Sequence, residues 1–258
     1  MRSRSSDKVC LRIRRQDGPD KLASRRWEEF EVPRFPRMSV LDALRRIARE
    51  PVTKEGKRAA PVAWDCSCLE ELCGACAMNI DGVARQACGA LIDDLAPKGN
   101  KPIVLEPLSK FPVVRDLVVD RSKMFEDLVR TRAWIDIDGT HVTGEGLRES
   151  VERQRVRYVI SRCMMCGCCL EACPNANDSS AFMGAAVVNQ VRYFSLHPSA
   201  SDSRAERLDS VMGRGGVADC GKAQVCGEVC PMGIPLVESI SYVARDTTKR
   251  LVFGWLLG

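Results

Sequence analysis

The sequence has few of the residues that enzymes use for acid–base or nucleophilic chemistry. It holds two histidines, His141 and His197, among 258 residues, too few for a histidine-based metal site. No Ser/His/Asp set, no glycine-rich nucleotide loop and no pair of acids placed for hydrolysis is recognisable. Because Pro198 follows His197, the expected role of this histidine is to end a helix. These absences indicate that the chain itself does not make or break bonds in a substrate.

Long apolar runs are also missing. The longest, Leu251 to Gly258, has eight residues, far short of the ~20 that a helix needs to cross a bilayer. The amino terminus, Met-Arg-Ser-Arg-Ser-Ser-Asp-Lys, lacks the apolar core of a secretory signal. We therefore expect a chain that does not span a membrane by itself and that works in a reducing, cytosolic environment.

Cysteine, in contrast, is abundant, with 14 residues. The densest stretch reads Cys163-x2-Cys166-x2-Cys169-x3-Cys173-Pro174, which is the spacing that bacterial ferredoxins use. In that motif three thiolates bind one iron-sulfur cube, and the fourth thiolate binds a different cluster. The motif therefore requires further cysteines elsewhere in the chain.

An upstream group of cysteines follows the plant-type spacing for a two-iron cluster. Its members are Cys68-x4-Cys73-x2-Cys76 and, as the fourth ligand, Cys88. Three ligands on one tight loop would surround one side of a [2Fe-2S] cluster. Gly74 and Gly89 fit this role, because glycine lets backbone N–H groups approach the cluster sulfurs. The alternative is that both glycines only form turns.

A downstream group reads Cys220-x5-Cys226-x3-Cys230-Pro231. Paired Cys-Pro motifs exchange their last cysteines between clusters. A [4Fe-4S] cluster is therefore predicted on Cys163, Cys166, Cys169 and Cys230. By symmetry with the first motif, a fourth ligand for the remaining thiolates would stand at residue 223, which is alanine. A [3Fe-4S] cluster with one empty corner is therefore predicted on Cys173, Cys220 and Cys226.

Other uses of so many thiols are a zinc site and a secreted disulfide scaffold. Triplets that end in Cys-Pro, together with an odd set of three, favour iron-sulfur clusters over zinc, and the missing signal peptide argues against the scaffold. Cys10, Cys66 and Cys168 fall outside the ligand pattern and are expected to be small buried residues.

The net charge of +5 would by itself suggest a nucleic-acid or lipid-headgroup partner. Three oxidised clusters with their thiolates add about −6, which leaves about −1. The basic residues then offset the charge of the cofactors, and no nucleic-acid partner is expected.

The first part of the chain has the pattern of a small sheet. Alternating apolar residues predict one hairpin over 9–13 and 27–32 and a second over 77–86 around Asp81-Gly82, with 103–105 as a closing strand. Ser39 caps a helix that Pro51 ends. Residues 1–106 are therefore predicted to form a β-grasp plant-type [2Fe-2S] ferredoxin domain.

After residue 106 the strand pattern stops and helical periodicity appears over 116–134, 179–194 and 236–245. Glycine-rich loops are expected at 139–146 and 213–216. Residues 107–258 are therefore predicted to form an all-α helical ferredoxin domain that carries the [4Fe-4S] and [3Fe-4S] clusters. The predicted fold class of the whole chain is α+β.

In this order, the motifs resemble the iron-sulfur subunits of succinate dehydrogenase and fumarate reductase over nearly the whole chain. Cys73-Gly-Ala-Cys-Ala-Met resembles the family's Cys-Gly-Ser-Cys-Ala-Met, and Phe111-Pro-Val-Val-Arg-Asp-Leu-Val-Val-Asp120 resembles its interdomain entry. Asp65-Cys-Ser-Cys-Leu-Glu-Glu-Leu-Cys and Cys173-Pro-Asn-Ala-Asn-Asp are similar to the menaquinone-linked Gram-positive branch.

The resemblance implies an electron-transfer subunit of a succinate:quinone oxidoreductase, respiratory complex II, in the tricarboxylic acid cycle. A separate flavoprotein would oxidise succinate at covalent FAD. Electrons would then pass through the [2Fe-2S], [4Fe-4S] and [3Fe-4S] clusters to a quinone, with menaquinone expected, at a membrane anchor that carries haem in some members. The subunit would be peripheral, on the cytoplasmic face of the membrane. Fumarate reductase, with the electrons running in reverse, and a related oxidoreductase with another substrate are the alternatives.

One departure from the family bears on the quinone. Many members have tryptophans just after the Cys173-Pro174 position and a histidine after the Cys220 position, where these residues help to form a quinone pocket. This chain has Asn177, Asp178 and Gly221 there. The resemblance therefore leaves open whether a quinone binds close to the third cluster or whether electrons first pass through the membrane subunit.

Overall fold

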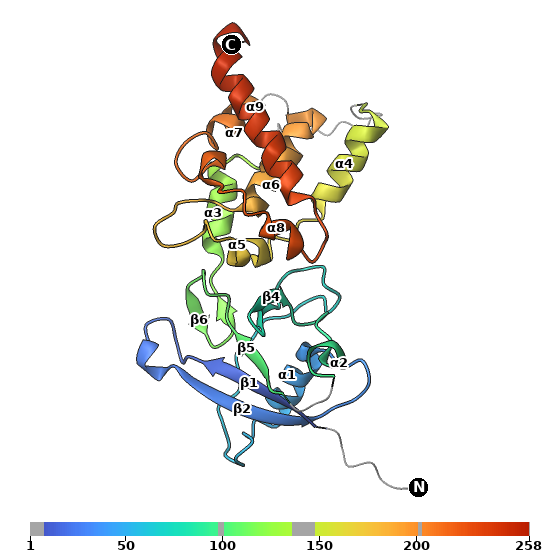
Figure 1. Ribbon diagram of the computed structural model, residues 1–258, viewed down its shortest axis with the longest axis vertical. Helices are drawn as coiled ribbons and strands as arrows, with labels where there is room; N and C mark the ends of the chain where they lie inside the picture. The colour runs from blue at the N-terminus through green and yellow to red at the C-terminus, as the bar shows by residue number, and fades with distance from the viewer. Residues whose placement is uncertain (1–7, 98–100, 136–147, 201–202, 258) are drawn as a thin grey trace. The chain divides into compact units, whose positions relative to one another are not determined.

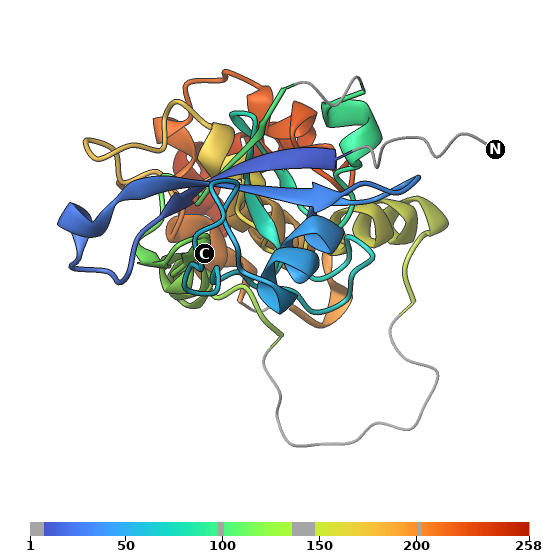
Figure 2. The same cartoon turned by 90° about the horizontal axis from the view of Figure 1, so that it is seen from below.

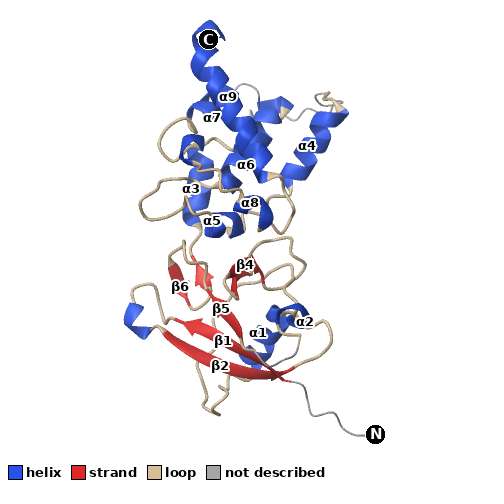
Figure 3. Ribbon diagram, in the orientation of Figure 1, coloured by secondary structure: helices blue, strands red, loops and turns tan. Residues whose placement is uncertain are grey.

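The computed structural model describes residues 8–97, 101–135, 148–200 and 203–257. They divide into two compact units (Figure 1). The first unit extends to Arg121 and also includes Cys166–Glu171, and the second holds Ser122–Met165 and the chain from Ala172 onward. The strands lie in the first unit and most helices in the second (Figure 3), so the predicted α+β class is confirmed. The sequence predicts the domain boundary at residue 106, whereas the compact unit continues to Arg121.

A five-stranded sheet forms the frame of the first unit. Its strand order is β2-β1-β5-β3-β4. β1 pairs antiparallel with β2 and parallel with β5, and β3 pairs antiparallel with both β4 and β5. Both predicted hairpins and the closing strand are thereby confirmed. The strands are β1 (Lys8–Arg15), β2 (Arg26–Pro33), β3 (Ala77–Ile80), β4 (Val83–Gln86) and β5 (Ile103–Glu106).

Helix α1 (Val40–Arg49) lies beside this sheet (Figure 2). It begins with the predicted capping box: Ser39 Oγ accepts a hydrogen bond from the Asp42 N–H at 3.1 Å, and the Asp42 carboxylate accepts one from the Ser39 N–H at 3.1 Å. Leu44 and Ile47 of α1 share one buried core with the inward-facing residues of β1. A short helix, α2 (Ile92–Leu95), completes this part of the unit.

A buried ion pair connects the two ends of the first unit. The side chains of Arg15 and Asp116 are both fully buried, with Nε to Oδ1 at 2.9 Å and Nη2 to Oδ2 at 3.2 Å. Asp116 also accepts hydrogen bonds from the N–H groups of Gln16 and Ala63, at 3.1 and 2.8 Å. Glu28 contacts the same guanidinium. Because its remaining polar atoms are satisfied in this way, the pair can be accommodated away from water.

Asp116 also explains where the predicted helix over 116–134 is wrong. Residues 113–119 form a two-stranded hairpin, β6 (Val113–Arg115) and β7 (Val118–Val119), so the strand pattern does not stop at residue 106. Asp116 has φ +47° in the turn, which a helix cannot contain. The hydrogen bonds between Asp116 and Arg15 stabilise this turn, although the apolar periodicity favours a helix. Helix α3 (Ser122–Arg130) begins only after the hairpin.

The second unit is built from helices around α6 and α9. Val187, Val188 and Val191 of α6 and Val243 of α9 are fully buried. A buried polar chain links three helices: Ser239 Oγ of α9 donates to Asn189 Oδ1 of α6 at 2.8 Å, and Asn189 Nδ2 donates to the carbonyl of Ile160 at 2.9 Å. Besides α3, the helices after residue 121 are α4 (Val151–Ser161), α5 (Cys168–Ala172), α6 (Ala185–Leu196), α7 (Arg204–Asp209), α8 (Val225–Glu228) and α9 (Leu236–Leu257).

The helix boundaries differ from the sequence prediction in several places. The predicted helix over 179–194 begins only at Ala185, after Gly184 with φ +87°, and α9 continues well beyond residue 245. Helix α4 was not predicted, because its charged sequence has a weak apolar pattern. The predicted end of a helix at His197 is confirmed. The predicted glycine loop at 139–146, with His141, lies outside the described residues.

A search of the described helices for one long and apolar enough to cross a membrane finds none. Residues 251–253 of α9 are apolar and exposed, with 72% of Leu251 and 50% of Phe253 accessible.

Replacing Asp116 by alanine is expected to lower the free energy of unfolding by about 3–5 kcal/mol, because the buried Arg15 guanidinium loses its partner. Chemical denaturation of the cluster-containing protein, followed by far-ultraviolet circular dichroism, measures this loss. The control is Lys8→Gln, which removes the exposed pair between Lys8 and Glu31 and should cost less than ~1 kcal/mol. Equal losses in the two variants would contradict the role given to the Arg15–Asp116 pair.

Candidate metal centres

The loop between α1 and β3 carries three of the four cysteines of the predicted two-iron site, and Cys88 lies after β4. Cys76 Sγ lies 3.4 Å from Cys88 Sγ, and the loop closes on itself because the N–H groups of Cys68 and Cys73 donate to each other's Sγ atoms, at 3.5 and 3.3 Å. Cys76 directly precedes β3 and Cys88 follows β4. The second hairpin of the sheet therefore positions two of the four thiols.

Backbone N–H groups surround the sulfur atoms of this loop. Cys68 Sγ accepts from the N–H groups of Glu70 and Leu72, at 3.4 and 3.2 Å. Cys88 Sγ accepts from the N–H of Glu71 at 3.3 Å. Hydrogen bonds of this kind stabilise thiolates and help to set the reduction potential of a bound cluster. The donors are Glu70, Glu71 and Leu72, so the contribution of Gly74 and Gly89 to the N–H donors stays a prediction.

Left-handed backbone conformations turn these N–H groups inward. Leu69 has φ +65° and Glu71 has φ +57°, a region that costs a non-glycine residue roughly 1–2 kcal/mol. Gly74 has φ +75°, so the turn at this position favours glycine. A Cβ at Gly89 would lie 2.0 Å from the Glu71 carboxyl group, so the side chain of Glu71 closes over this position.

The thiols differ in their protonation equilibria. Hydrogen bonds, first of all from the Glu70 N–H, lower the pKa of Cys68 to about 7. Burial raises the pKa of Cys76 to about 12. A positive iron centre that binds Cys76 would compensate for this burial, because metal coordination favours the thiolate. Two thiols in contact, Cys76 and Cys88, and a loop whose N–H groups point at cysteine sulfurs are a donor set that fits an iron-sulfur cluster.

Arg121 fixes the ligand loop from outside. Its Nη1 and Nη2 donate to the carbonyl oxygens of Gly74 and Ala75, both at 2.9 Å. These carbonyls lie between Cys73 and Cys76, so one planar guanidinium holds the backbone between two ligands. The sequence analysis did not select Arg121, because a single arginine far from the loop in sequence gives no motif.

The four cysteines predicted to bind the [4Fe-4S] cluster come from both units. Cys166 and Cys169 are buried and lie in the stretch Cys166–Glu171 that packs with the first unit. Cys163 and Cys230 are half-buried and belong to the second unit. A hydrogen bond with Cys168, together with the positive charge of Arg121, lowers the pKa of Cys166 to about 7. The joint binding of one cluster by these four residues stays a prediction.

One small cavity in the second unit is lined by the three cysteines of the predicted [3Fe-4S] site, which are Cys173, Cys220 and Cys226. Ala223 lines the same cavity. Two non-glycine residues beside it, Lys222 and Gln224, have φ +57° and +63°, so the backbone turns sharply around this alanine. Burial, followed by the charges of Cys173 and Cys220, raises the pKa of Cys226. The residue that sequence symmetry selected thus lies at the site, with a methyl group where a thiol would be needed.

The three cysteines outside the ligand pattern behave differently from one another. Cys168 is fully buried, as predicted, and Cys10 is half-buried. Cys66 is exposed, so the prediction that it is buried is wrong. All 14 cysteines are free thiols in this structure. Among the described residues, no three His, Cys, Asp or Glu side chains are placed to hold a single metal ion.

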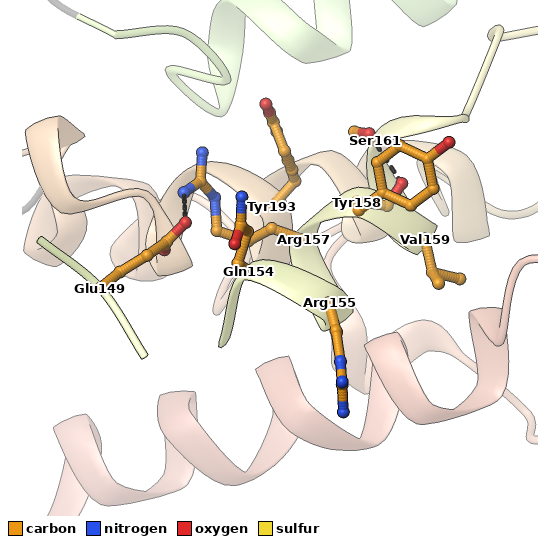
Figure 4. Close-up of a pocket in the computed structure, with 8 residues that line it drawn as sticks. All are labelled: Glu149, Gln154, Arg155, Arg157, Tyr158, Val159, Ser161 and Tyr193. Atoms are coloured by element: carbon orange, nitrogen blue, oxygen red, sulfur yellow. Dashed lines mark hydrogen bonds and ion pairs between the residues drawn. The ribbon is translucent and has the colours of Figure 1, made fainter. Parts of the chain in front are cut away.

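A separate open pocket on the helical unit contains no cysteine (Figure 4). Arg157 Nη1 and Glu149 Oε1 form an ion pair at 2.6 Å in it, and the Arg157 guanidinium lies 5.6 Å from the centre of the Tyr193 ring. Tyr158 is 71% exposed at its edge. The lining contains no thiol, so the pocket is distinct from the predicted cluster sites.

Comparisons with known proteins agree with this arrangement. A 2Fe-2S iron-sulfur cluster binding domain matches residues 10–126, and a 4Fe-4S dicluster domain matches residues 149–234. Together with the sheet and the helices, they define the class: a two-domain protein that binds iron-sulfur clusters for electron transfer.

Relatives give the family. The chain is 51% identical to the succinate dehydrogenase iron-sulfur subunit of Bacillus subtilis (strain 168), over 92% of each chain. It is 28% identical to the fumarate reductase iron-sulfur subunit of Wolinella succinogenes, over 92% of this chain and 96% of the other. The chain belongs to the family of succinate dehydrogenase and fumarate reductase iron-sulfur subunits, as its motifs predict. It is thus a subunit of an oxidoreductase complex.

A solved structure agrees with the fold. A chain of the Mycobacterium smegmatis Sdh1 complex in the apo form matches with a TM-score of 0.79 at 22% identity, over 95% of this chain and 98% of the other. At this identity the match concerns the fold alone.

Replacing Arg121 by alanine is expected to speed the loss of the two-iron cluster to a chelator severalfold, because the backbone between Cys73 and Cys76 loses two hydrogen bonds. The decay of visible absorbance and circular dichroism measures the rate. Arg45→Ala, at an exposed position of α1, is the charge-matched control and should leave the rate unchanged. If both variants lost the cluster at the same rate, Arg121 would have no specific role at this loop.

Proposed function

We propose that this chain carries electrons within a succinate dehydrogenase, from FAD on a flavoprotein partner to a quinone at a membrane anchor. The observation that carries the proposal is the 51% identity to a succinate dehydrogenase subunit over 92% of both chains. Fumarate reductase is the second candidate, because subunits of that enzyme match at 28% identity. The same ligand spacing serves both directions, since cluster potentials depend on burial, charge and hydrogen bonds.

Three clusters would supply stepwise one-electron transfer when bound. The chain's own residues hold them: the [2Fe-2S] cluster on Cys68, Cys73, Cys76 and Cys88; the [4Fe-4S] cluster on Cys163, Cys166, Cys169 and Cys230; and the [3Fe-4S] cluster on Cys173, Cys220 and Cys226. Support for the first comes from the converging sulfurs and their N–H donors. Support for the third comes from the cavity that its three thiols share with Ala223.

Exposed apolar residues of the helical unit support partner subunits. Phe125 and Val129 lie one turn apart on α3 and are 53% and 65% exposed, so they form one apolar face. Leu251 and Phe253 expose apolar surface near the end of α9. Surfaces of this kind mark protein–protein or membrane contacts. We assign them to the flavoprotein and to one or more anchor subunits, with this chain peripheral on the cytoplasmic face of the membrane.

The quinone, for which we propose menaquinone, is assigned to the anchor rather than to a pocket on this chain. A Cβ at Gly221 would lie 2.6 Å from the Asn175 side-chain amide, so this asparagine fills the space that a side chain at residue 221 would need. Asn177 Nδ2 donates to the Pro174 carbonyl at 2.9 Å, and its Oδ1 accepts from Ser179 Oγ at 2.6 Å. The turn after Cys173 is thus polar and closed on itself, which disfavours an apolar quinone ring beside it. Electrons would reach the quinone through the anchor, with haem as the carrier there.

Affinity purification of the tagged chain from its host membranes tests the proposal. We expect a flavoprotein with covalent FAD and at least one membrane protein to copurify, and the complex to reduce a menaquinone analogue with succinate. A complex that reduces fumarate but does not oxidise succinate would favour the second candidate. A colourless protein without iron and sulfide would exclude both.

Replacing Ala223 by cysteine is expected to convert the third centre into a [4Fe-4S] cluster, because a thiol then stands at the vacant corner. The oxidised complex should lose the low-temperature EPR signal of a [3Fe-4S] cluster, and its iron content should rise by one atom per chain, since a four-iron cluster replaces a three-iron one. Ala223→Ser, which is similar in size but lacks sulfur, is the control and should keep the signal. A wild-type complex that lacks the three-iron signal would contradict the assignment.

A further inference from the structure

The stretch Cys166–Glu171 packs with the first unit although it lies far beyond Arg121 in the sequence. This stretch contains Cys166 and Cys169, two proposed ligands of the second cluster. The residues that attach this stretch to the first unit therefore also fix Cys166 and Cys169, two of the four proposed ligands of the [4Fe-4S] cluster. The first unit also contains the proposed ligands of the [2Fe-2S] cluster.

Glu171 makes the main polar attachment. Its Oε1 accepts hydrogen bonds from Asn79 Nδ2 at 2.7 Å, from the Ser109 N–H at 2.9 Å and from Ser109 Oγ at 2.7 Å. Its Oε2 accepts one from the Lys110 N–H at 3.0 Å. Four donors converge on one carboxylate, and hydrogen bonds to a charged acceptor are about twice as strong as neutral ones.

Gly167 makes the main apolar attachment to the same part of the first unit. Its φ is +90°, and a Cβ there would lie 2.9 Å from Phe111 Cζ and 3.4 Å from Leu108 Cδ1. The backbone therefore touches the stretch 108–111 directly, between Cys166 and Cys169. The ligand-bearing stretch is fixed at two points, at Gly167 by close contact and at Glu171 by hydrogen bonds.

The hydrogen bonds of Glu171 lead back to the first cluster over a short path. Asn79 lies on β3, which begins immediately after Cys76, and Glu171 lies close after Cys169 in α5. The 2.7 Å hydrogen bond between Asn79 and Glu171 thus joins two residues that each lie close to a proposed ligand. Asn79 is on the strand that follows Cys76, and Glu171 is in the same short helix as Cys169.

We propose that Glu171 is a positioning residue that fixes Cys166 and Cys169 on the first unit and thereby sets the coupling between the first and second clusters. The inference rests on the proposed function and ligand assignment. Glu171 acts through the position of the two cysteines and does not itself bind iron. Its loss lets the ligand stretch shift away from β3, which weakens the magnetic interaction and slows electron exchange between the clusters.

The test uses the purified complex with Glu171→Leu, which removes all four acceptor contacts at similar volume, and Glu171→Gln, which keeps one acceptor oxygen. In the fully reduced state, EPR power saturation of the [2Fe-2S] signal reports how strongly the neighbouring reduced cluster relaxes it. We expect a severalfold fall in half-saturation power for Glu171→Leu, a smaller fall for Glu171→Gln, and normal iron and sulfide content. Glu228→Leu is the matched control, because this exposed glutamate also lies close to proposed ligands, and it should leave the relaxation unchanged.

Unchanged relaxation in Glu171→Leu with all clusters present would overturn the proposal. If Glu171→Leu does not assemble, Asn79→Leu and Ser109→Ala decide, because each removes only part of the donor set. Weaker coupling in both supports the proposal, and wild-type coupling in both overturns it. The proposed function is tested by a different outcome: it is wrong if the wild-type complex contains no iron-sulfur clusters. The positioning role is wrong if the variants keep both the clusters and the wild-type coupling between them.

Discussion

Negative charge on sulfur is the constraint on which this structure depends. A thiolate that binds iron needs hydrogen-bond donors nearby, and the first ligand loop supplies them from its own backbone. To point these N–H groups inward, the loop adopts left-handed conformations at residues that are not glycine. Among the described residues, nine non-glycine residues have positive φ, and five of them, Leu69, Glu71, Met165, Lys222 and Gln224, lie in the three cysteine loops. Backbone strain is thus concentrated in the loops that are predicted to bind iron.

The regular elements around the loops keep this strained backbone in place. The β3–β4 hairpin positions Cys76 and Cys88, the Arg121 guanidinium holds the carbonyls between Cys73 and Cys76, and buried Arg15 and Asp116 hold the segment that leads to Arg121. Each of these supports is a charged or hydrogen-bonded group with several partners. Apolar packing alone would bury the sheet, but it would not orient individual backbone dipoles toward sulfur.

At the proposed third site, one residue, Ala223, decides the kind of cluster that the proposal assigns there. Ala223 stands at the cavity wall where a fourth thiol would bind, and the backbone around it keeps the left-handed turns at Lys222 and Gln224. Asn175 fills the space beside Gly221 in the same region. A small residue, Ala223, and a polar one, Asn175, therefore lie where the sequence analysis expected a missing ligand and a missing aromatic pocket.

The sequence alone determined the family, the fold class, both hairpins of the sheet, the capping box at Ser39 and the candidate ligands, because all of these depend on residue type and on spacing within a few residues. It was wrong about residues 116–121, missed α4, and gave no signal for Arg121 or Glu171. Those features were decided by tertiary structure: Arg15 pairs with Asp116 across 101 residues, and Asn79 pairs with Glu171 across 92. Local spacing specifies which atoms can bind iron, but only the folded chain brings together the distant partners that hold those atoms in position.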